Sequence, residues 1–161
     1  MKNKILVSSC LLGELVRYDG VIKEPVFDLL LLHQKGLVIS VCPEVSGGLS
    51  VPRLPAEITN GDGYTVLSGK SDIIRSDGVS VKDAYVVGAK FALSLVKKYN
   101  IKIAILKSKS PSCSNNMIYD GSFNRKLSSG VGVSTALLEL NDVKVFNENQ
   151  IEEAFALYLT L

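Results

Sequence analysis

The sequence predicts an α/β fold, a three-layer domain with a mostly parallel sheet and helices on both faces, Rossmann-like or flavodoxin-like. Two observations predict this class. Short buried-strand patterns alternate with helical patterns along the chain, and such alternation is typical of parallel strands joined by helices. The chain has 161 residues and is 47% apolar, which suffices for one hydrophobic core. We therefore expect a single domain over residues 1–161.

The first third of the chain contains two predicted strands and one predicted helix. Residues 4–8 are a short β-prone run, residues 27–35 carry helix formers that end before Gly36, and residues 37–41 form a second buried-strand pattern. Proline and glycine then exclude regular structure through a long loop, at Pro43, Gly47, Gly48, Pro52 and Pro55. Compact domains rarely keep such a loop unless it binds something, so we expect it to take part in function.

The rest of the chain continues the alternation. Residues 64–67 and 72–75 are expected to be extended, and a helix is expected over 81–99, with Ser80 as its N-cap and Asn100 at its end. The remaining predicted elements are a strand over 101–106, a helix over 133–139, a strand over 143–146 and a helix over 151–161 capped by Asn147 with Gln150.

Composition narrows the class of partner. Lys and Arg number 18 against 16 Asp and Glu, so neither a strongly basic nucleic-acid surface nor an acidic tail is present. No run approaches the roughly 18 apolar residues that span a bilayer, and the apolar stretch before Cys10 is too short for a secretion signal. We expect a cytoplasmic protein with a small-molecule partner, without nucleic-acid or membrane binding. The sequence does not fix its oligomeric state.

The three cysteines follow three predicted strands. Cys10 comes after the first strand, Cys42 after the second, and Cys113 lies in the loop after the third. Because the carboxyl ends of parallel strands share one edge, we expect the three thiols to converge there. An odd number of cysteines in a reducing compartment argues against a disulfide framework, and soft thiolates select an iron–sulfur cluster or zinc. The alternative is three unrelated buried thiols that pack as small hydrophobes.

The segments around the cysteines resemble the thiouracil desulfidase family, long catalogued as a domain of unknown function. The resemblance rests on SCLLG at 9–13, VRYDG at 16–20, CPEV at 42–45, GGL at 47–49, PR at 52–53, PAEI at 55–58, LK at 106–107, SPSC at 110–113, YDG at 119–121 and GVGV at 130–133. These blocks cover most of the chain in the family's order. The resemblance implies an enzyme that holds a 4Fe-4S cluster on three thiolates, leaves the fourth iron without a protein ligand, and converts thiouracil to uracil and hydrosulfide.

Residues beside the cysteines carry the chemistry that this resemblance implies. An open iron is a Lewis acid with affinity for a thiocarbonyl sulfur, and Glu44, two residues after Cys42, is the natural base to activate water. Ser110 and Ser112 are candidates to donate hydrogen bonds to a developing oxyanion or to cluster sulfides. The alternatives are a Glu44 that only caps a backbone N–H and serines that are ordinary turn residues.

Four further residues are predicted to orient a planar heterocycle by stacking or bidentate contact, namely Arg17, Tyr18, Asp19 and Arg53. The Arg-Tyr-Asp-Gly segment is equally typical of a tight turn in which Asp pairs with a neighbouring Arg. For the whole chain, the alternative to an enzyme is a non-catalytic iron–sulfur or zinc-binding module.

One position departs from the family pattern. Ser114 stands where the family usually has Gly after its third cysteine. If the backbone there requires a positive φ, serine costs on the order of 1 kcal/mol and affects substrate preference more than cluster binding. His33 is expected to be an exposed helix residue, and the glycines at 130 and 132 lack the spacing of a nucleotide-binding fingerprint.

Overall fold

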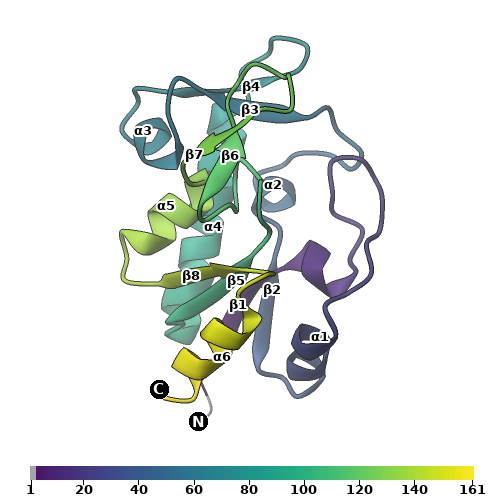
Figure 1. Cartoon of the computed structure of the whole chain (residues 1–161), viewed down its shortest axis with the longest axis vertical. Helices are drawn as coiled ribbons and strands as arrows, with labels where there is room; N and C mark the ends of the chain where they lie inside the picture. Colours follow the sequence, from purple (N-terminus) through teal and green to yellow (C-terminus); the bar gives the residue numbers. More distant parts are fainter. Residues whose placement is uncertain (1–2) are drawn as a thin grey trace.

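The computed structural model describes residues 3–161, and its centre is a parallel sheet of four strands (Figure 1). The strands run in the order β2-β1-β5-β8 and are β1 (Ile5–Ser8), β2 (Val38–Val41), β5 (Ile103–Leu106) and β8 (Lys144–Asn147). β1 pairs in parallel with both β2 and β5, and β5 pairs in parallel with β8. The predicted fold class is confirmed.

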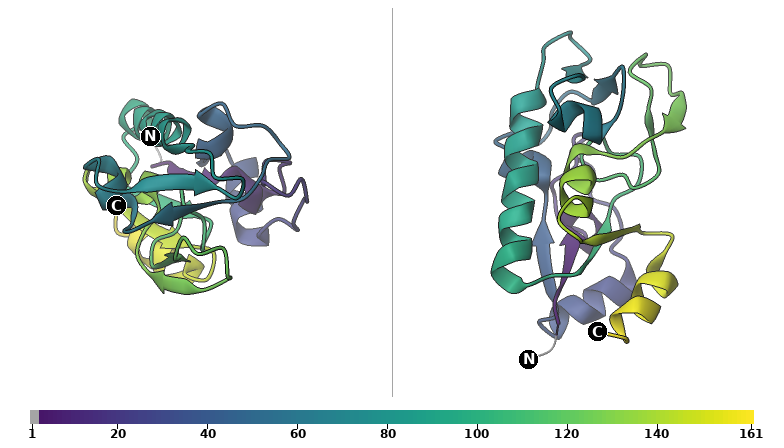
Figure 2. Two further views of the ribbon diagram at one scale, coloured as in Figure 1. Left: turned by 90° about the horizontal axis from the view of Figure 1, so that it is seen from above. Right: turned by 90° about the vertical axis from the view of Figure 1, so that its left-hand side faces the viewer.

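Helices cover both faces of this sheet (Figure 2). One face carries α1 (Phe27–Gln34) and α6 (Ile151–Tyr158), and the other carries α4 (Lys82–Tyr99) and α5 (Val133–Glu139). Successive strand residues point to opposite faces. In β1, Leu6 therefore packs with the α4 and α5 side, and Val7 packs with the α1 and α6 side. Burial on both faces explains why the strands read as continuous apolar runs.

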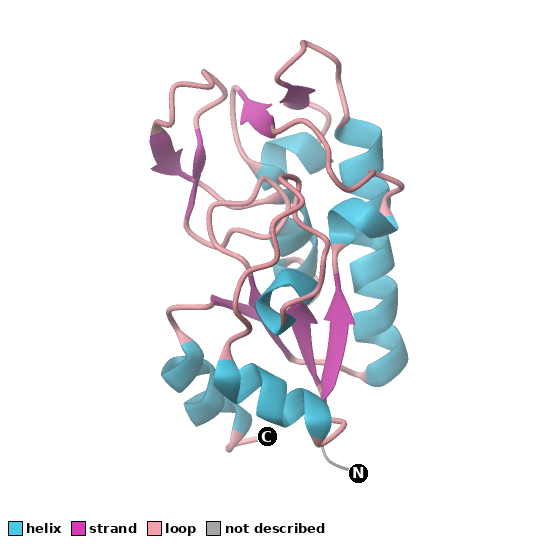
Figure 3. Cartoon of the chain, turned by 90° about the vertical axis from the view of Figure 1, so that its right-hand side faces the viewer, coloured by secondary structure: helices cyan, strands magenta, loops and turns pink. Residues whose placement is uncertain are grey.

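A cap of small elements stands beyond the carboxyl ends of the sheet, at the end of the molecule opposite both termini (Figure 1). It contains two antiparallel pairs with their own buried core, and its elements are β3 (Ala56–Thr59) with β4 (Asp72–Arg75), β6 (Met117–Tyr119) with β7 (Leu127–Ser129), α2 (Pro43–Ser46) and α3 (Gly63–Leu67). Figure 3 shows that loops occupy the region between the sheet and these small strands.

Two predicted elements of the cap are wrong. Residues 64–67 are helical rather than extended, because Asp62 accepts hydrogen bonds from the backbone N–H groups of Tyr64 (3.0 Å) and Thr65 (3.4 Å) and forms a capping box with Thr65. The loop after Cys42 is also not free of regular structure. It starts with the helical turn α2, because the fixed φ of Pro43 suits the first position of a helix.

One predicted helix cap is also wrong, and a second is displaced from the start of its helix. The N-cap of α4 is Val81, since the Ser80 hydroxyl donates instead to Asp72 (2.7 Å). For α6 the N-cap position is Gln150, but the predicted pairing of Asn147 with Gln150 is present in the turn before the helix. Asn147 Oδ1 accepts the Asn149 N–H at 2.8 Å, and Gln150 Oε1 accepts the Asn147 N–H at 3.1 Å. The left-handed Asn100 ends α4 as predicted, and His33 is exposed as predicted. No helix within residues 3–161 is long and apolar enough to cross a membrane.

Candidate active site

All three cysteines line one cavity of about 850 Å³ at the carboxyl end of the sheet. Cys10 lies in a 3₁₀ turn directly after β1, Cys42 lies between β2 and α2, and Cys113 lies in the turn after β5. β1 stands between β2 and β5, so the chain adds strands first on one side of β1 and then on the other. Open α/β sheets bind ligands at such a switch point.

The donor set fits an iron–sulfur cluster. All three thiols are free, Cys10 and Cys42 are half-buried, and Cys113 is buried. Within residues 3–161, no group of three His, Cys, Asp or Glu side chains is arranged to hold one metal ion. A four-iron cluster is wider than one ion and takes its thiolates from further apart. Three soft donors around a cavity of this size therefore suit a cluster better than a single zinc ion.

Burial controls the protonation of these thiols. Desolvation, with repulsion from Cys42, raises the pKa of Cys10 to about 11, and Lys107 and Arg17 act in the opposite direction. Desolvation also raises the pKa of Cys42 and of Cys113. The thiols of the metal-free protein are therefore protonated at neutral pH, and binding to iron releases their protons.

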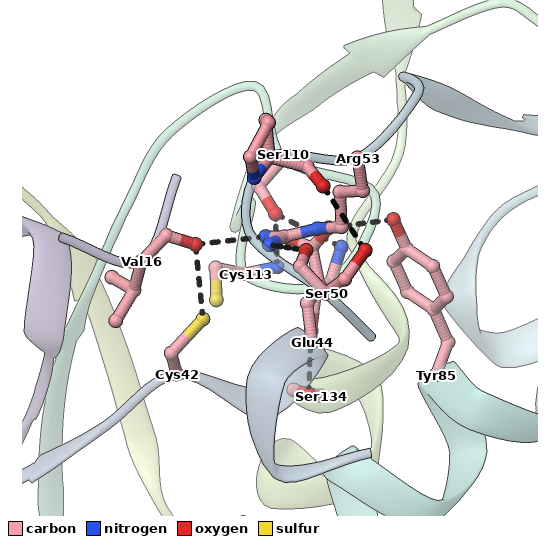
Figure 4. A network of polar contacts seen from close by, with 11 residues as sticks. Val16, Cys42, Glu44, Ser50, Arg53, Tyr85, Ser110, Cys113 and Ser134 are labelled. Atoms are coloured by element: carbon pink, nitrogen blue, oxygen red, sulfur yellow. Dashed lines mark hydrogen bonds and ion pairs between the residues drawn. The ribbon is translucent and has the colours of Figure 1, made fainter. Parts of the chain in front are cut away.

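The carboxylate of Glu44 is fixed by two donors (Figure 4). Its Oε1 accepts hydrogen bonds from Nε of Arg53 (3.2 Å) and from the hydroxyl of Tyr85 (2.7 Å). No residue in the described part of the chain bonds to its Oε2. The side chains of Arg53 and Glu44 are only 7% and 15% exposed, so their ion pair is largely shielded from water.

Arg53 also ties two loops to this carboxylate. Its guanidinium donates to the backbone carbonyls of Ser50 and Val16, at 3.0 Å each. The Val16 carbonyl also accepts the Cys42 thiol at 3.9 Å. Arg53 thus lines the cavity, but its guanidinium N–H groups already donate hydrogen bonds to Glu44 and to the two loops.

Close backbone contact between α2 and α4 sets the position of Cys42 and Glu44. Gly88 of α4 lies directly against Pro43, and a Cβ at Gly88 would overlap the carbonyl oxygen of Pro43. Gly47, just after α2, lies against α4 in the same way. Because no side chain separates the two helices, Tyr85 of α4 reaches Glu44.

The two predicted serines face different surroundings. Ser110 lines the cavity, and its Oγ accepts the backbone N–H groups of Ser112 and Cys113 at 3.1 Å each. Ser112 is fully buried, its hydroxyl bonds to Ser134 at 2.9 Å, and it does not line the cavity. Ser114 lies outside the positive-φ region and donates to the Met117 carbonyl at 2.5 Å, so the departure from the family pattern costs no backbone strain.

The predicted substrate-binding turn is closed by an ion pair. Arg17 Nη2 lies 2.9 Å from Asp19 Oδ2, and Nε donates to Oδ1 at 3.2 Å. The hydrogen bond from Arg17 lowers the pKa of Asp19. Arg17 and Tyr18 line the cavity, whereas Asp19 does not. Asp19 therefore pairs with Arg17 within the turn, as in the alternative interpretation of this segment, and does not face the cavity.

Sequence reasoning missed a third ion pair, which lies on the cavity wall. Lys107 Nζ lies 2.5 Å from Glu148 Oε1, and Ser108 donates to both oxygens of Glu148. Burial disfavours the Glu148 carboxylate, but the bonds from Lys107 and Ser108 outweigh it and lower the pKa of Glu148. Glu148 follows β8 as the cysteines follow their strands, so the rule that located the cysteines also points to it. Tyr85, inside a helix, gives no such signal.

Known proteins match this chain along nearly its whole length. The model of the 2-thiouracil desulfurase family matches residues 5–150. The uncharacterized protein YbbK of Bacillus subtilis (strain 168) is 41% identical over 149 residues, which are 92% of this chain and 98% of YbbK. The solved structure of the 4Fe-4S-dependent thiouracil desulfidase TudS has a TM-score of 0.87 and 40% identity, and the match covers 99% of each chain.

Proposed function

The chain belongs to the 2-thiouracil desulfurase family, and we propose that it is a desulfidase that removes sulfur from a thiolated pyrimidine such as 2-thiouracil. The products are uracil and hydrosulfide. The observation that carries this proposal is one cavity that collects three free thiols and the fixed carboxylate of Glu44. The likeness to TudS, a 4Fe-4S-dependent thiouracil desulfidase, supports both the reaction and the cofactor.

Cys10, Cys42 and Cys113 are the residues that would hold a 4Fe-4S cluster. When bound, it supplies an iron without a protein ligand, a Lewis acid with affinity for the thiocarbonyl sulfur. The overall change replaces C=S by C=O at the expense of one water, and no electrons are exchanged. The protein must therefore place a water next to the thiocarbonyl carbon and accept a proton from it.

Glu44 is the proposed base. Its Oε1 is occupied by Arg53 and Tyr85, which leaves Oε2 to accept the proton of the attacking water. Ser110 accepts two backbone N–H groups through its oxygen, so its own proton is available for the hydroxyl oxygen that water adds at the attacked carbon, while the negative charge goes to the sulfur. Ser112 has no part in this scheme, since its hydroxyl is bonded to Ser134.

Arg17 and Tyr18 are the proposed contacts to the planar ring. Both line the cavity, and the ion pair with Asp19 holds the Arg17 side chain in place. The guanidinium is suited to stack on the heterocycle or to donate to its carbonyl, and Tyr18 offers a ring face.

The substitution Glu44→Gln tests the proposed base, because it keeps the shape of the side chain and removes its ability to take a proton. After anaerobic reconstitution with iron and sulfide, the variant should keep the visible absorbance of the cluster. It should lose hydrosulfide release from 2-thiouracil by roughly 100-fold or more. Glu152→Gln, at an exposed position of α6, is the matched control and should retain full activity. Unchanged activity of Glu44→Gln contradicts the role of Glu44, and a cluster-loaded wild type inert with every thiopyrimidine contradicts the proposed function.

A further inference from the structure

Two family-like segments have no part in the chemistry proposed above, PAEI at 55–58 and YDG at 119–121. The fold brings them together, since the first forms the start of β3 and the second ends β6, and β3 contacts β6 in the cap (Figure 1). Residues 120–126 connect β6 to β7 and form the hairpin loop.

The hairpin loop is docked onto β3 at two points. Glu57 of β3 is 7% exposed, and its Oε2 accepts the backbone N–H of Phe123 at 2.9 Å. Gly121, at φ +89°, lies so close to β3 that a Cβ there would stand 2.8 Å from the carbonyl oxygen of Ile58. The hydrogen bond from Phe123 to the buried Glu57 carboxylate and the close approach of Gly121 to Ile58 hold the hairpin loop against β3.

The docked loop contributes two residues with large side chains to the lining of the cavity. Phe123 and Arg125 both line it, and so do Glu57 and Tyr119. Phe123 and Arg125 have φ values of 58° and 57°, an uncommon conformation for bulky residues that persists where the surroundings enforce it. The cysteines bound the cavity on the sheet side, whereas these residues bound it on the cap side.

We propose that the hairpin loop is the specificity-determining wall of the cavity. Phe123 and Arg125 contact the part of the thio-heterocycle remote from its sulfur, Phe123 through its apolar ring and Arg125 by donating to a ring carbonyl. Glu57 is a positioning residue that holds Phe123 in place. The identity of the substrate rests on the proposed function, whereas the docking of the loop does not.

Limited trypsin digestion tests the docking without cluster or substrate. Arg125 and Lys126 are exposed, so a loop released from β3 becomes a better substrate for trypsin at these residues. Glu57→Ala should speed cleavage there about tenfold, and Glu57→Gln, which keeps an acceptor oxygen, should restore the slow rate. Thermal unfolding of both variants shows that they are folded. Equal cleavage rates in the wild type and Glu57→Ala overturn the positioning role of Glu57.

Binding measurements test the specificity. Calorimetric Kd values of 2-thiouracil and 6-propyl-2-thiouracil are compared for reconstituted Glu44→Gln, in which turnover is slowed, and for the double variant that carries Glu44→Gln and Phe123→Ala. Removal of the ring opens the wall, so the ratio of the two Kd values should shift about tenfold in favour of the propyl compound. An unchanged ratio overturns the specificity role. A Kd ratio that shifts while the reconstituted wild type is inert with every thiopyrimidine contradicts the proposed function and supports the specificity wall.

Discussion

Glu44 is oriented by two donors that reach the same oxygen, and one of them, Tyr85, comes from a distant helix. Tyr85 is 2% exposed, and its hydroxyl donates a hydrogen bond to the Glu44 carboxylate. Nothing local in the sequence separates this tyrosine from an ordinary core residue. Glu44 itself could be predicted, because it follows a cysteine at the end of a strand.

Tyr85→Phe should lower kcat for 2-thiouracil about tenfold, because a hydrogen bond to a charged group contributes roughly 1.5–3 kcal/mol. The KM should stay nearly constant, because Tyr85 acts through Glu44. Tyr64→Phe is the matched control, since its hydroxyl bonds to Glu139 on the surface. Equal loss of activity in both variants would contradict the positioning of Glu44 by Tyr85.

Glu148 makes stability depend on pH. Its pKa is lower in the folded protein, so its contribution is present above the unfolded pKa of about 4.3 and is lost as the pH falls through the folded pKa. Glu148→Gln should therefore lower the free energy of unfolding at pH 7, and the difference from the wild type should shrink below pH 4. Urea unfolding of both proteins at several pH values measures this difference in the free energy of unfolding. A difference independent of pH would show that the ion pair with Lys107 contributes nothing.

The residues of one motif do not all face the same way. Ser110 and Ser112 belong to the same turn, but Ser110 lines the cavity and Ser112 bonds to Ser134. Likewise, Arg17 and Tyr18 line the cavity while Asp19 closes the turn. Sequence identifies such a segment as functional, but the direction of each side chain depends on turn geometry set by distant contacts.

At the scale of elements, long periodic segments and buried strands could be predicted, but among the short elements of the cap only β4 was, at residues 72–75. The helix at 133–139 has the predicted bounds. β6 and β7 have three residues each, too few for a periodic pattern. The misassigned residues 64–67 become helical because a capping box outweighs their β propensity.

Gly88→Ala tests the contact between α4 and α2. A methyl group would overlap Pro43, so α2 must move and carry Cys42 and Glu44 with it. We expect a loss of about 1–3 kcal/mol in the free energy of unfolding and a reconstituted protein that loses its visible absorbance faster under chelator. Lys90→Ala, at an exposed position of the same helix, should change neither. A Gly88→Ala protein as stable and as well loaded as the wild type contradicts this packing argument.

At the scale of the whole molecule, the parallel sheet gathers residues that are far apart in the chain. The alternation of strands and helices predicts that the loops after three strands share an edge, and the order β2-β1-β5-β8 places them side by side. The cap that closes the cavity from the other side could not be predicted in the same way. Its position depends on contacts such as that between Glu57 and Phe123, which no local pattern encodes.

The most direct test is the iron and acid-labile sulfide content of the anaerobically reconstituted chain, measured for the wild type and for Cys10→Ser, Cys42→Ser and Cys113→Ser. The wild type should hold about four iron and four sulfide per chain, and each serine variant should lose most of both while remaining folded. A wild type that binds zinc but no iron, or a serine variant that keeps the full load, would contradict a cluster held by these three thiols.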